Sequence, residues 1–241
     1  MDPLHELIHS MTASEKGYFK KYASPKNGGD YVKLFDALAA MNAYDEQKLL
    51  IRFKKTDAVK NLARSKNYLY NAVIRSLLSY HEESSPKIII RTLLNEAEML
   101  YNRGLLQQVR KRLDKAKLLA SDGEWFLLWL DVLGQQRKLC DNRIYAPDEL
   151  SADDISREID EVTKQMQHFF ELNEVFQKQS HLSKASVMVR GHDNKQQFIE
   201  ISQHPLLSAE SSALSVKALI LFNYIRYWND IMLQQYASAR K

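Results

Sequence analysis

The segment His5-Glu6-Leu7-Ile8-His9 has the residue spacing of a zinc protease motif. On a helix, His5 and His9 lie one turn apart on the same face, where both can bind zinc while the glutamate acts as a general base. Such a site needs a third protein ligand and a surrounding cleft. The segment instead lies on a short predicted helix with no recognisable downstream ligand motif, so we favour an ordinary amphipathic helix over zinc catalysis.

Other residue types that carry chemistry do not form a recognisable set. Cys140 ends an apolar segment with no histidine nearby, which favours a buried structural thiol over a nucleophile. No Gly-rich phosphate loop is present, and His168, His181, His192 and His204 are dispersed along the chain. We therefore predict that the protein is not an enzyme and uses no metal or other cofactor.

The region from Lys48 to Arg75 is strongly basic, because it contains eight Lys and Arg residues and Asp57 is its one acidic residue. Such a surface can steer an anionic partner, and Tyr68 and Tyr70 nearby are candidates for stacking on bases. The candidate contacts to an anionic partner are Lys54, Lys55, Lys60, Arg64 and Lys66. The competing interpretation is a solvated helix face, which we favour because no base-reading signature accompanies the charges.

Composition indicates a helical protein without a membrane span. The 241 residues include only 7 Gly and 5 Pro, and helix-favouring Leu, Ala, Lys, Glu and Gln are abundant. The single cysteine cannot form an internal disulfide, and the N-terminus lacks the basic start and apolar run of a secretory signal. No apolar run approaches the roughly 20 residues that cross a bilayer. We expect a cytoplasmic protein of undetermined oligomeric state.

Capping residues predict where the first helices begin. Asp2 and Pro3 suit the N-cap and first position of a helix that ends near Met11. Thr12 and Glu15 fit a capping box that opens a second, short helix. We expect a loop at residues 24–29 and helices from residue 30, from 45 to about 53, and from 57 to about 81. The last helix is expected to bury one face: Leu62, Leu69, Val73, Leu77 and Tyr80.

Helices with short connections are predicted for the rest of the chain. Pro86 starts one helix, Gly104 ends it, Asp122-Gly123 separates the next two, and Ser151 caps a long one. Short connections make sequential helices pack antiparallel. The expected helices span 86–103, 105–120, 124–140, 151 to about 189, 196–202 and about 209–233, with an irregular connection at 141–150.

Residues Leu93 to Ala120 resemble a tetratricopeptide repeat, a pair of antiparallel helices with small residues where the helices touch. The matching positions are the small Ala97, bulky Leu100 and Tyr101, turn residue Gly104, bulky Leu113 and small Ala116. Val109 stands where the repeat has a small residue, and Ser121 stands where it has a proline. The resemblance implies an open stack of helix pairs that binds another protein, whereas a generic helical bundle is the alternative.

A weaker resemblance to half a repeat begins at Tyr224 and reaches Ala239. Because half a repeat leaves an apolar face uncovered, we expect the chain to be a fragment of a longer repeat protein.

Nine aromatic residues could line a peptide groove or fill the core: Trp125, Phe126, Trp129, Phe169, Phe170, Phe222, Tyr224, Tyr227 and Trp228.

Together these patterns predict an all-α protein with two parts. Residues 1–82 form a small basic helical cluster, and residues 83–241 form antiparallel helix pairs stacked as a tetratricopeptide-like α-solenoid. The predicted function is a non-catalytic scaffold that binds a protein or peptide. The alternative is a nucleic-acid-binding or regulatory protein that acts through the basic N-terminal region.

Overall fold

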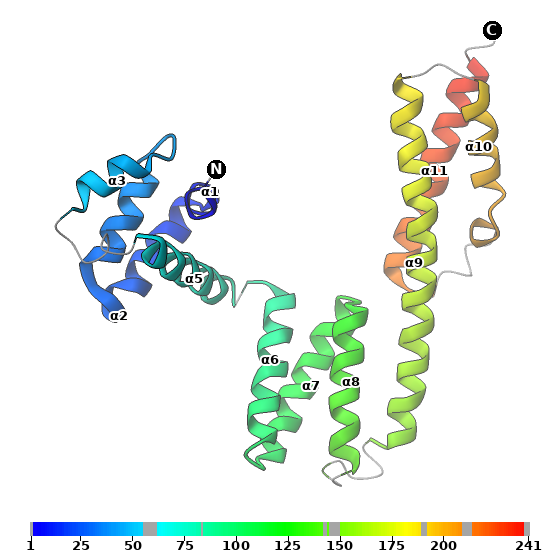
Figure 1. The fold of residues 1–241 in the computed structure, drawn as a ribbon. Coiled ribbons are helices and arrows are strands. Elements are labelled where there is room, and N and C mark those ends of the chain that lie inside the picture. The colour runs from blue at the N-terminus through cyan, green and yellow to red at the C-terminus, as the bar shows by residue number, and fades with distance from the viewer. Residues whose placement is uncertain are drawn as a thin grey trace. The chain divides into compact units, whose positions relative to one another are not determined.

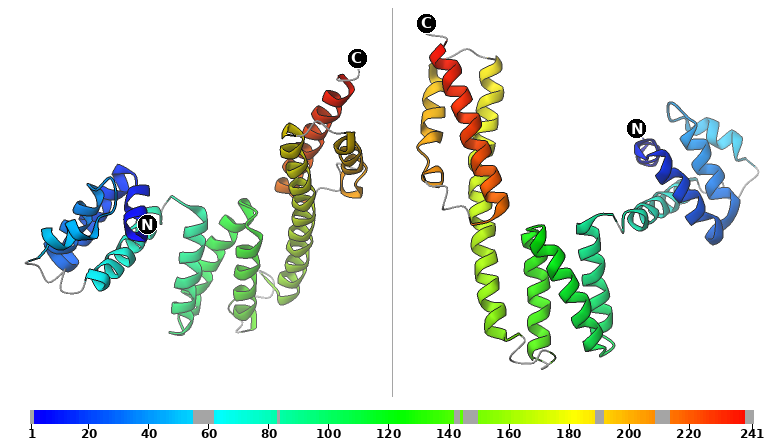
Figure 2. Two further views of the ribbon diagram at one scale, coloured as in Figure 1. Left: turned by 45° about the horizontal axis from the view of Figure 1, so that its top comes forward. Right: turned by 180° about the vertical axis from the view of Figure 1, so that it is seen from behind.

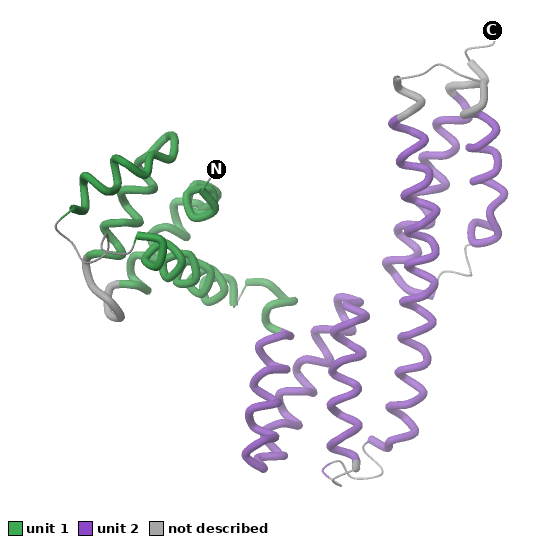
Figure 3. The backbone as a smooth tube through the Cα atoms, in the orientation of Figure 1, with its two compact units in different colours: residues 1–89 green, residues 90–241 purple. Residues whose placement is uncertain are grey.

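The computed structural model describes the backbone of residues 2–54, 62–82, 84–141, 144, 150–188, 192–208 and 214–238. Side chains are described for these residues except 24–29, 141, 185–188, 192–194 and 235–238. All regular secondary structure in these ranges is helical, which confirms the predicted all-α class (Figure 1). The residues form two compact units, 1–89 and 90–241 (Figure 3). The predicted domain limits, 1–82 and 83–241, stay a prediction.

Four described helices make up the first unit: α1 (Pro3–Ser10), α2 (Ala13–Ala39), α3 (Glu46–Arg52) and α5 (Leu62–His81). The predicted caps are confirmed. Asp2 accepts hydrogen bonds from the backbone N–H groups of Leu4 and His5, both at 3.1 Å. Thr12 and Glu15 form the expected capping box. These side chains satisfy backbone donors that a helix start leaves unpaired.

The α2 segment turns back on itself, although its backbone is helical throughout. Phe19 and Phe35 have ring centroids 4.4 Å apart, and Lys20 pairs with Asp36 at 2.7 Å. A straight helix would separate each pair by about 24 Å. The chain therefore reverses between residues 23 and 30, where we predicted a loop, and α2 has two arms, 13–23 and 30–39. The prediction of a non-helical loop at residues 24–29 is wrong, because the backbone there is helical, and the reversal itself was not predicted.

The core of the first unit lies where α1, both arms of α2, α3 and α5 meet. It is filled by apolar side chains from each helix: Leu4, Ile8, Phe19, Leu34, Phe35, Leu38, Leu49, Leu69 and Val73. The predicted α5 face is confirmed in its first three turns, but Tyr80 is 37% exposed. The Tyr80 ring instead contacts the edge of Tyr18 in the first arm of α2, at 5.3 Å.

The second unit contains a chain of helices that pack on their neighbours (Figures 1 and 2). Its helices are α6 (Pro86–Tyr101), α7 (Leu106–Asp122), α8 (Phe126–Asp141), α9 (Ala152–Met188), α10 (His192–Ser202), a 3₁₀ turn (Pro205–Leu207) and α11 (Val216–Ser238). Helix α8 lies between α7 and α9, while α11 packs on α9 and α10. The predicted loop at 141–150 and the helix end at 191 fall mainly outside the described residues.

Helix α9 joins two separate apolar clusters because its 37 residues span about 55 Å. Ile155 and Val162, near its start, pack with Phe126 and Leu133 of α8. Leu172 and Val175, further along, pack with residues of the 3₁₀ turn, α10 and α11, such as Phe222. Glu158 adds polar contacts at the first cluster, accepting hydrogen bonds from Lys117 of α7 at 2.5 Å and Trp129 of α8 at 2.9 Å.

The connection between α7 and α8 also holds the start of α11. Both carboxylate oxygens of Glu124 accept hydrogen bonds from α11, from the Val216 and Lys217 backbone N–H groups, at 2.7 Å each. Lys217 donates back to the Glu124 carbonyl at 3.0 Å and lies 3.7 Å from the centre of the Trp125 ring. Glu124 has a positive φ of 45°, a strained conformation that this set of contacts compensates.

Replacing Gly123 with alanine is expected to destabilise this connection. A Cβ atom at residue 123 would lie 2.3 Å from Nε1 of Trp125, so the indole must move off Lys217. We expect Gly123→Ala to lower the free energy of unfolding by about 1–3 kcal/mol. Urea unfolding followed by tryptophan fluorescence measures this, because Trp125, Trp129 and Trp228 all lie in the second unit.

Gly134→Ala is the matched control. A Cβ at exposed Gly134 within α8 meets no atom within 4 Å, so this variant is expected to be more stable by about 0.5–1 kcal/mol. Equal effects of the two substitutions would contradict the steric role assigned to Gly123.

Candidate functional site

Among the predicted contacts to an anionic partner that the structure describes, Arg64 and Lys66 do not share one surface. Lys55 and Lys60 lie outside the described residues, and Lys54 is exposed just after α3. Arg64 and Lys66 both lie on α5 but point in different directions, since side chains two positions apart on a helix are rotated by roughly 200° about its axis. Arg64 lines a cavity, whereas Lys66 faces the start of α1.

Lys66 forms an internal polar cluster. Its ammonium lies 2.6 Å from the Asp2 carboxylate and donates a hydrogen bond to the Tyr44 hydroxyl at 2.7 Å. Tyr44 in turn donates to Glu46 at 2.9 Å. Because Asp2 also caps α1, Lys66 holds the beginning of α1 against α5. The described geometry therefore gives Lys66 a structural role apart from the cavity that Arg64 lines.

Both members of the Asp2 and Lys66 pair are stabilised in their charged forms. Burial by itself raises the pKa of Asp2, but hydrogen bonds from Lys66 and the His5 amide outweigh it, so the pKa lies below 3.8. Burial likewise lowers the pKa of Lys66, but its bonds to Asp2 and Tyr44 outweigh burial and move the pKa above 10.5. The pair is ionised throughout the neutral range.

The histidines of the zinc-like motif both face the second arm of α2. His5 Nε2 lies 2.9 Å from the Met41 carbonyl oxygen, and His9 Nε2 lies 3.2 Å from that of Leu38. The Leu38 carbonyl lies in the last turn of α2 and also accepts from the Met41 backbone N–H at 3.2 Å, and Met41 follows the end of the helix. The two histidines thus join α1 to the end of α2. Within the part of the chain that is described, no group of three or more His, Cys, Asp or Glu residues could hold a metal ion.

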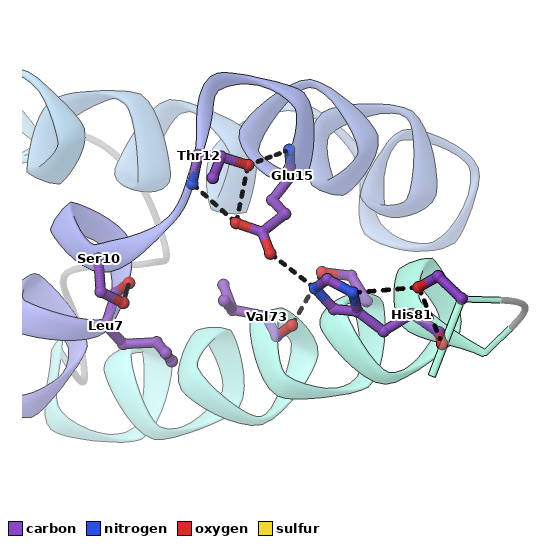
Figure 4. Close-up of polar contacts among 8 residues, drawn as sticks. Leu7, Ser10, Thr12, Glu15, Val73 and His81 are labelled. Carbon is purple, nitrogen blue, oxygen red and sulfur yellow. Dashed lines mark hydrogen bonds and ion pairs between the residues drawn. The ribbon is translucent and has the colours of Figure 1, made fainter. Parts of the chain in front are cut away.

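The capping residue Glu15 extends its role to α5 (Figure 4). Its carboxylate accepts hydrogen bonds from the Thr12 backbone N–H at 2.7 Å and the Thr12 hydroxyl at 2.9 Å. The other oxygen lies 2.7 Å from Nε2 of His81, at the end of α5. The bond from the Thr12 amide, followed by that from His81, places the pKa of Glu15 below its ordinary 4.5.

A cavity of about 330 Å³ opens between the two arms of α2 and the helix α5. We call it the α2–α5 groove. It brings together Arg64 and Tyr68, two residues singled out from the sequence, whereas Tyr70 packs against the core. Its lining residues are Phe19, Tyr22, Ala23, Tyr31, Arg64, Asn67, Tyr68, Leu69, Asn71, Ala72 and Arg75. None of these described lining residues is acidic.

A second surface, the outer α11 face, is apolar and exposed. Its members lie along one side of α11: Val216, Leu219, Ile220, Tyr224 and Tyr227. Val216, Ile220 and Tyr227 are each about two-thirds exposed, at 64%, 65% and 66%. The opposite side of α11 is buried against α9 and α10 and contains Ala218, Phe222, Ile225 and Met232.

The nine aromatic residues proposed for a core or a groove divide between these roles. Phe126 and Phe222 are buried, whereas Phe170, Tyr224 and Tyr227 are exposed. Trp125, Trp129, Phe169 and Trp228 are partly buried. Periodicity could indicate which aromatics share a helix side, but the exposed side of α11 required knowledge of which neighbours cover the other.

Among the described side chains, Cys140 and the dispersed histidines form no group that could hold a metal ion, although His181 and His204 line one cavity. Cys140 is partly buried, with its Sγ 3.6 Å from the Leu150 carbonyl oxygen. His168 is buried, while His204 caps the 3₁₀ turn by accepting from the Leu206 backbone N–H. His192 has no described side chain.

Comparison of the chain with protein-family models, with curated proteins and with solved structures gives no match. No helix in the described ranges is long and apolar enough to cross a membrane.

Removing the Lys66 ammonium is expected to destabilise the first unit. In Lys66→Met, the carboxylate of Asp2, a residue only 7% exposed, loses its cation, which should lower the free energy of unfolding by about 1–3 kcal/mol. Lys48→Met is the control, because the Lys48 side chain is 75% exposed where it pairs with Asp45. This substitution should change the free energy of unfolding by less than about 0.5 kcal/mol. Denaturant unfolding and amide hydrogen exchange in α1 measure both effects.

Acid is expected to weaken the contact between Glu15, Thr12 and His81. Because folding lowers the pKa of Glu15, its contribution is complete above about pH 4.5 and is lost as pH falls through the lower folded-state value. Glu15→Gln keeps a capping side chain without a titratable carboxyl. The stability difference between wild type and Glu15→Gln, from thermal unfolding between pH 7 and 3, should therefore shrink with acid; a constant difference would contradict this assignment.

Proposed function

We propose that this protein is a non-catalytic scaffold that binds a helical segment of another protein on the outer α11 face. The observation that carries the proposal is the continuous exposure of Val216, Ile220, Tyr224 and Tyr227 on one side of a packed helix. Exposed apolar patches of this kind mark interaction surfaces in soluble proteins. Tyrosine suits such a surface, since it combines a large apolar ring with a polar end.

A helix is the partner shape that fits this side of α11. The exposed residues are spaced by four, four and three positions from Val216 to Tyr227, which is the spacing of one helix face. The buried side has the same type of spacing and packs against the helices α9 and α10. A further helix on the outer face would continue the packing of α7 on α8, α8 on α9, and α9 on α11.

Charged residues of both signs lie beside the face, since Asp230 is exposed four positions after Arg226, and the arginine is the one next to Tyr227. Arg226 is exposed next to Tyr227 and lies with its guanidinium 5.4 Å from the centre of the Phe222 ring. A partner helix with an apolar stripe and an acidic flank would bury the stripe and pair with this guanidinium.

The tetratricopeptide-like interpretation belongs to this proposal. Ala97 in α6 and Ala116 in α7, the two small residues of the resemblance, are fully buried. Gly104 adopts a φ of 71° at the turn between these helices, a conformation in which glycine is favoured. Glu96 and Arg112 also pair between α6 and α7 at 2.9 Å. These features support, for α6 to α11, stacked helix pairs that offer a side for binding.

Peptide binding tests the proposal directly. The probe is a fluorescein-labelled helical peptide of about 18 residues with leucines on one stripe and glutamates beside it, and the control peptide has the same composition in scrambled order. Fluorescence anisotropy should show micromolar binding of the striped peptide alone. Because one large buried side chain contributes about 1.5–3 kcal/mol, Ile220→Glu should weaken binding at least about tenfold.

Leu118→Glu supplies the matched control, since Leu118 on α7 is also 65% exposed but lies outside the outer α11 face. It should bind the striped peptide like the wild type. Equal binding of both peptides, or equal losses in both variants, would refute the proposal. Self-association that Ile220→Glu abolishes would assign the face to a second copy of this chain instead.

A further inference from the structure

We infer that the α2–α5 groove binds a segment of single-stranded nucleic acid. This inference concerns the first unit and is independent of the scaffold function proposed for α11. It rests on four properties of the groove: its charge, the order of side chains along α5, its tyrosine rings and its size.

The net charge of the protein is concentrated in the unit that contains the groove. Residues 1–89 contain 14 Lys and Arg and 10 Asp and Glu, which accounts for the whole formal net charge of +4. The charges of residues 90–241 sum to zero. The groove itself is lined by Arg64 and Arg75, with no carboxylate among its described lining residues. An anionic strand is therefore attracted to this unit and meets no negative side chain among the described residues that line the groove.

The polar side chains follow one side of α5. Arg64, Tyr68, Asn71 and Arg75 are spaced by four, three and four positions, so they lie along a single helix face. The two arginines are about 16 Å apart along the helix axis. Arg75 is exposed and makes no side-chain hydrogen bond or ion pair with the described residues. A ligand that contacts both arginines must be elongated, with negative charge at more than one point.

Two asparagines lie between the arginines. Asn71 donates a hydrogen bond from Nδ2 to the Asn67 carbonyl oxygen at 2.9 Å and contacts Asn67 Oδ1 at 3.3 Å. These contacts join the two asparagines, which both line the groove. Amide groups can both donate and accept hydrogen bonds, as the edges of nucleobases require.

Tyrosine rings supply surfaces for stacking. Tyr68 is 41% exposed, and its ring centroid lies 4.5 Å from that of Tyr31 on the second arm of α2. Tyr22, from the first arm, stacks with Tyr18 at 6.3 Å and also lines the groove. Rings held by neighbouring rings form a firm platform, and stacking of bases on such rings tolerates different sequences.

The dimensions favour a strand over other anions. About 330 Å³ is near the lower limit for a small-molecule pocket, so the groove accommodates part of a chain better than a large compact ligand. A duplex would hide the base faces that the tyrosines can stack on. A phosphorylated peptide would use the arginines but not three tyrosine rings together with two amides.

Anisotropy of a fluorescein-labelled 12-nucleotide single strand, prepared as dT and as rU, tests the inference with the full chain. We expect binding at 50 mM salt that weakens about sevenfold at 200 mM salt, since two phosphate contacts to a single strand give a slope of roughly −1.4. Tyr68→Ala should weaken binding roughly five- to hundredfold, and Tyr68→Phe should preserve it. Arg75→Gln, at an exposed position that does not endanger folding, should reduce both affinity and the salt slope.

Lys54→Gln is the matched control, because Lys54 is exposed in the same unit but does not line the groove. It should retain nearly all binding. Losses equal to those of Arg75→Gln would show general attraction to a basic surface and would overturn the inference. Absence of strand binding at 50 mM salt, equal binding of a 12-base-pair duplex or of adenosine monophosphate, or tighter binding of a phosphotyrosine peptide would also overturn it.

Discussion

The structure depends on burial of one apolar side of each helix against another helix. An isolated helix of the lengths seen here is only marginally stable in water, so tertiary packing has to supply most of the stabilisation. Helix α9 illustrates this requirement most clearly. Its 37 residues bury Ile155 and Val162 against α8 and, further along, Leu172 and Val175 against the cluster that contains α11. Each fully buried side chain of this size contributes about 1.5–3 kcal/mol, so α9 stabilises both clusters at once.

Helix termini impose the second constraint, because their unpaired backbone groups need polar partners. Several of these partners come from distant parts of the chain. Glu124 reaches the first amides of α11, which lie 92 and 93 positions away, and His5 and His9 reach carbonyls at the end of α2. Polar residues that resemble parts of a reactive site in the sequence thus connect helices in the structure. Their chemistry is the same in both interpretations, namely the capacity of a ring nitrogen or carboxylate to form a hydrogen bond with a backbone group.

Local signals in the sequence predicted the elements well, because capping acts over three or four residues. The Asp2 cap, the Thr12 and Glu15 capping box and the turn glycine Gly104 all follow from short-range spacing. Contacts between distant segments could not be predicted in this way. The reversal inside α2 is evident only from pairs such as Phe19 with Phe35, and no neighbouring residue indicates that Glu124 caps α11.

The candidate groove was partly predictable for the same physical reason. The basic character of the region and the presence of Tyr68 follow from composition, but the division between Arg64 and Lys66 depends on which side of α5 meets α1. Although they are two positions apart in the sequence, Arg64 lines the groove and Lys66 pairs with Asp2. Arg75, Asn67 and Asn71 share the side of Arg64, yet nothing in the sequence shows that the two arms of α2 form the opposite wall.

The two proposed surfaces differ in the force that would hold a ligand. In the α2–α5 groove, charge brings the ligand close and stacking retains it, so the interaction would be sensitive to salt. On the outer α11 face, binding would come mainly from removing apolar side chains from water, and salt would weaken only the smaller contribution of the pairing with Arg226. The second case is the stronger one structurally, because α11 carries apolar residues on both its buried side and its exposed side. Large apolar side chains gathered on one exposed side of a packed helix mark an interaction surface, so the exposure of Ile220 and Tyr227 favours a partner that covers this face.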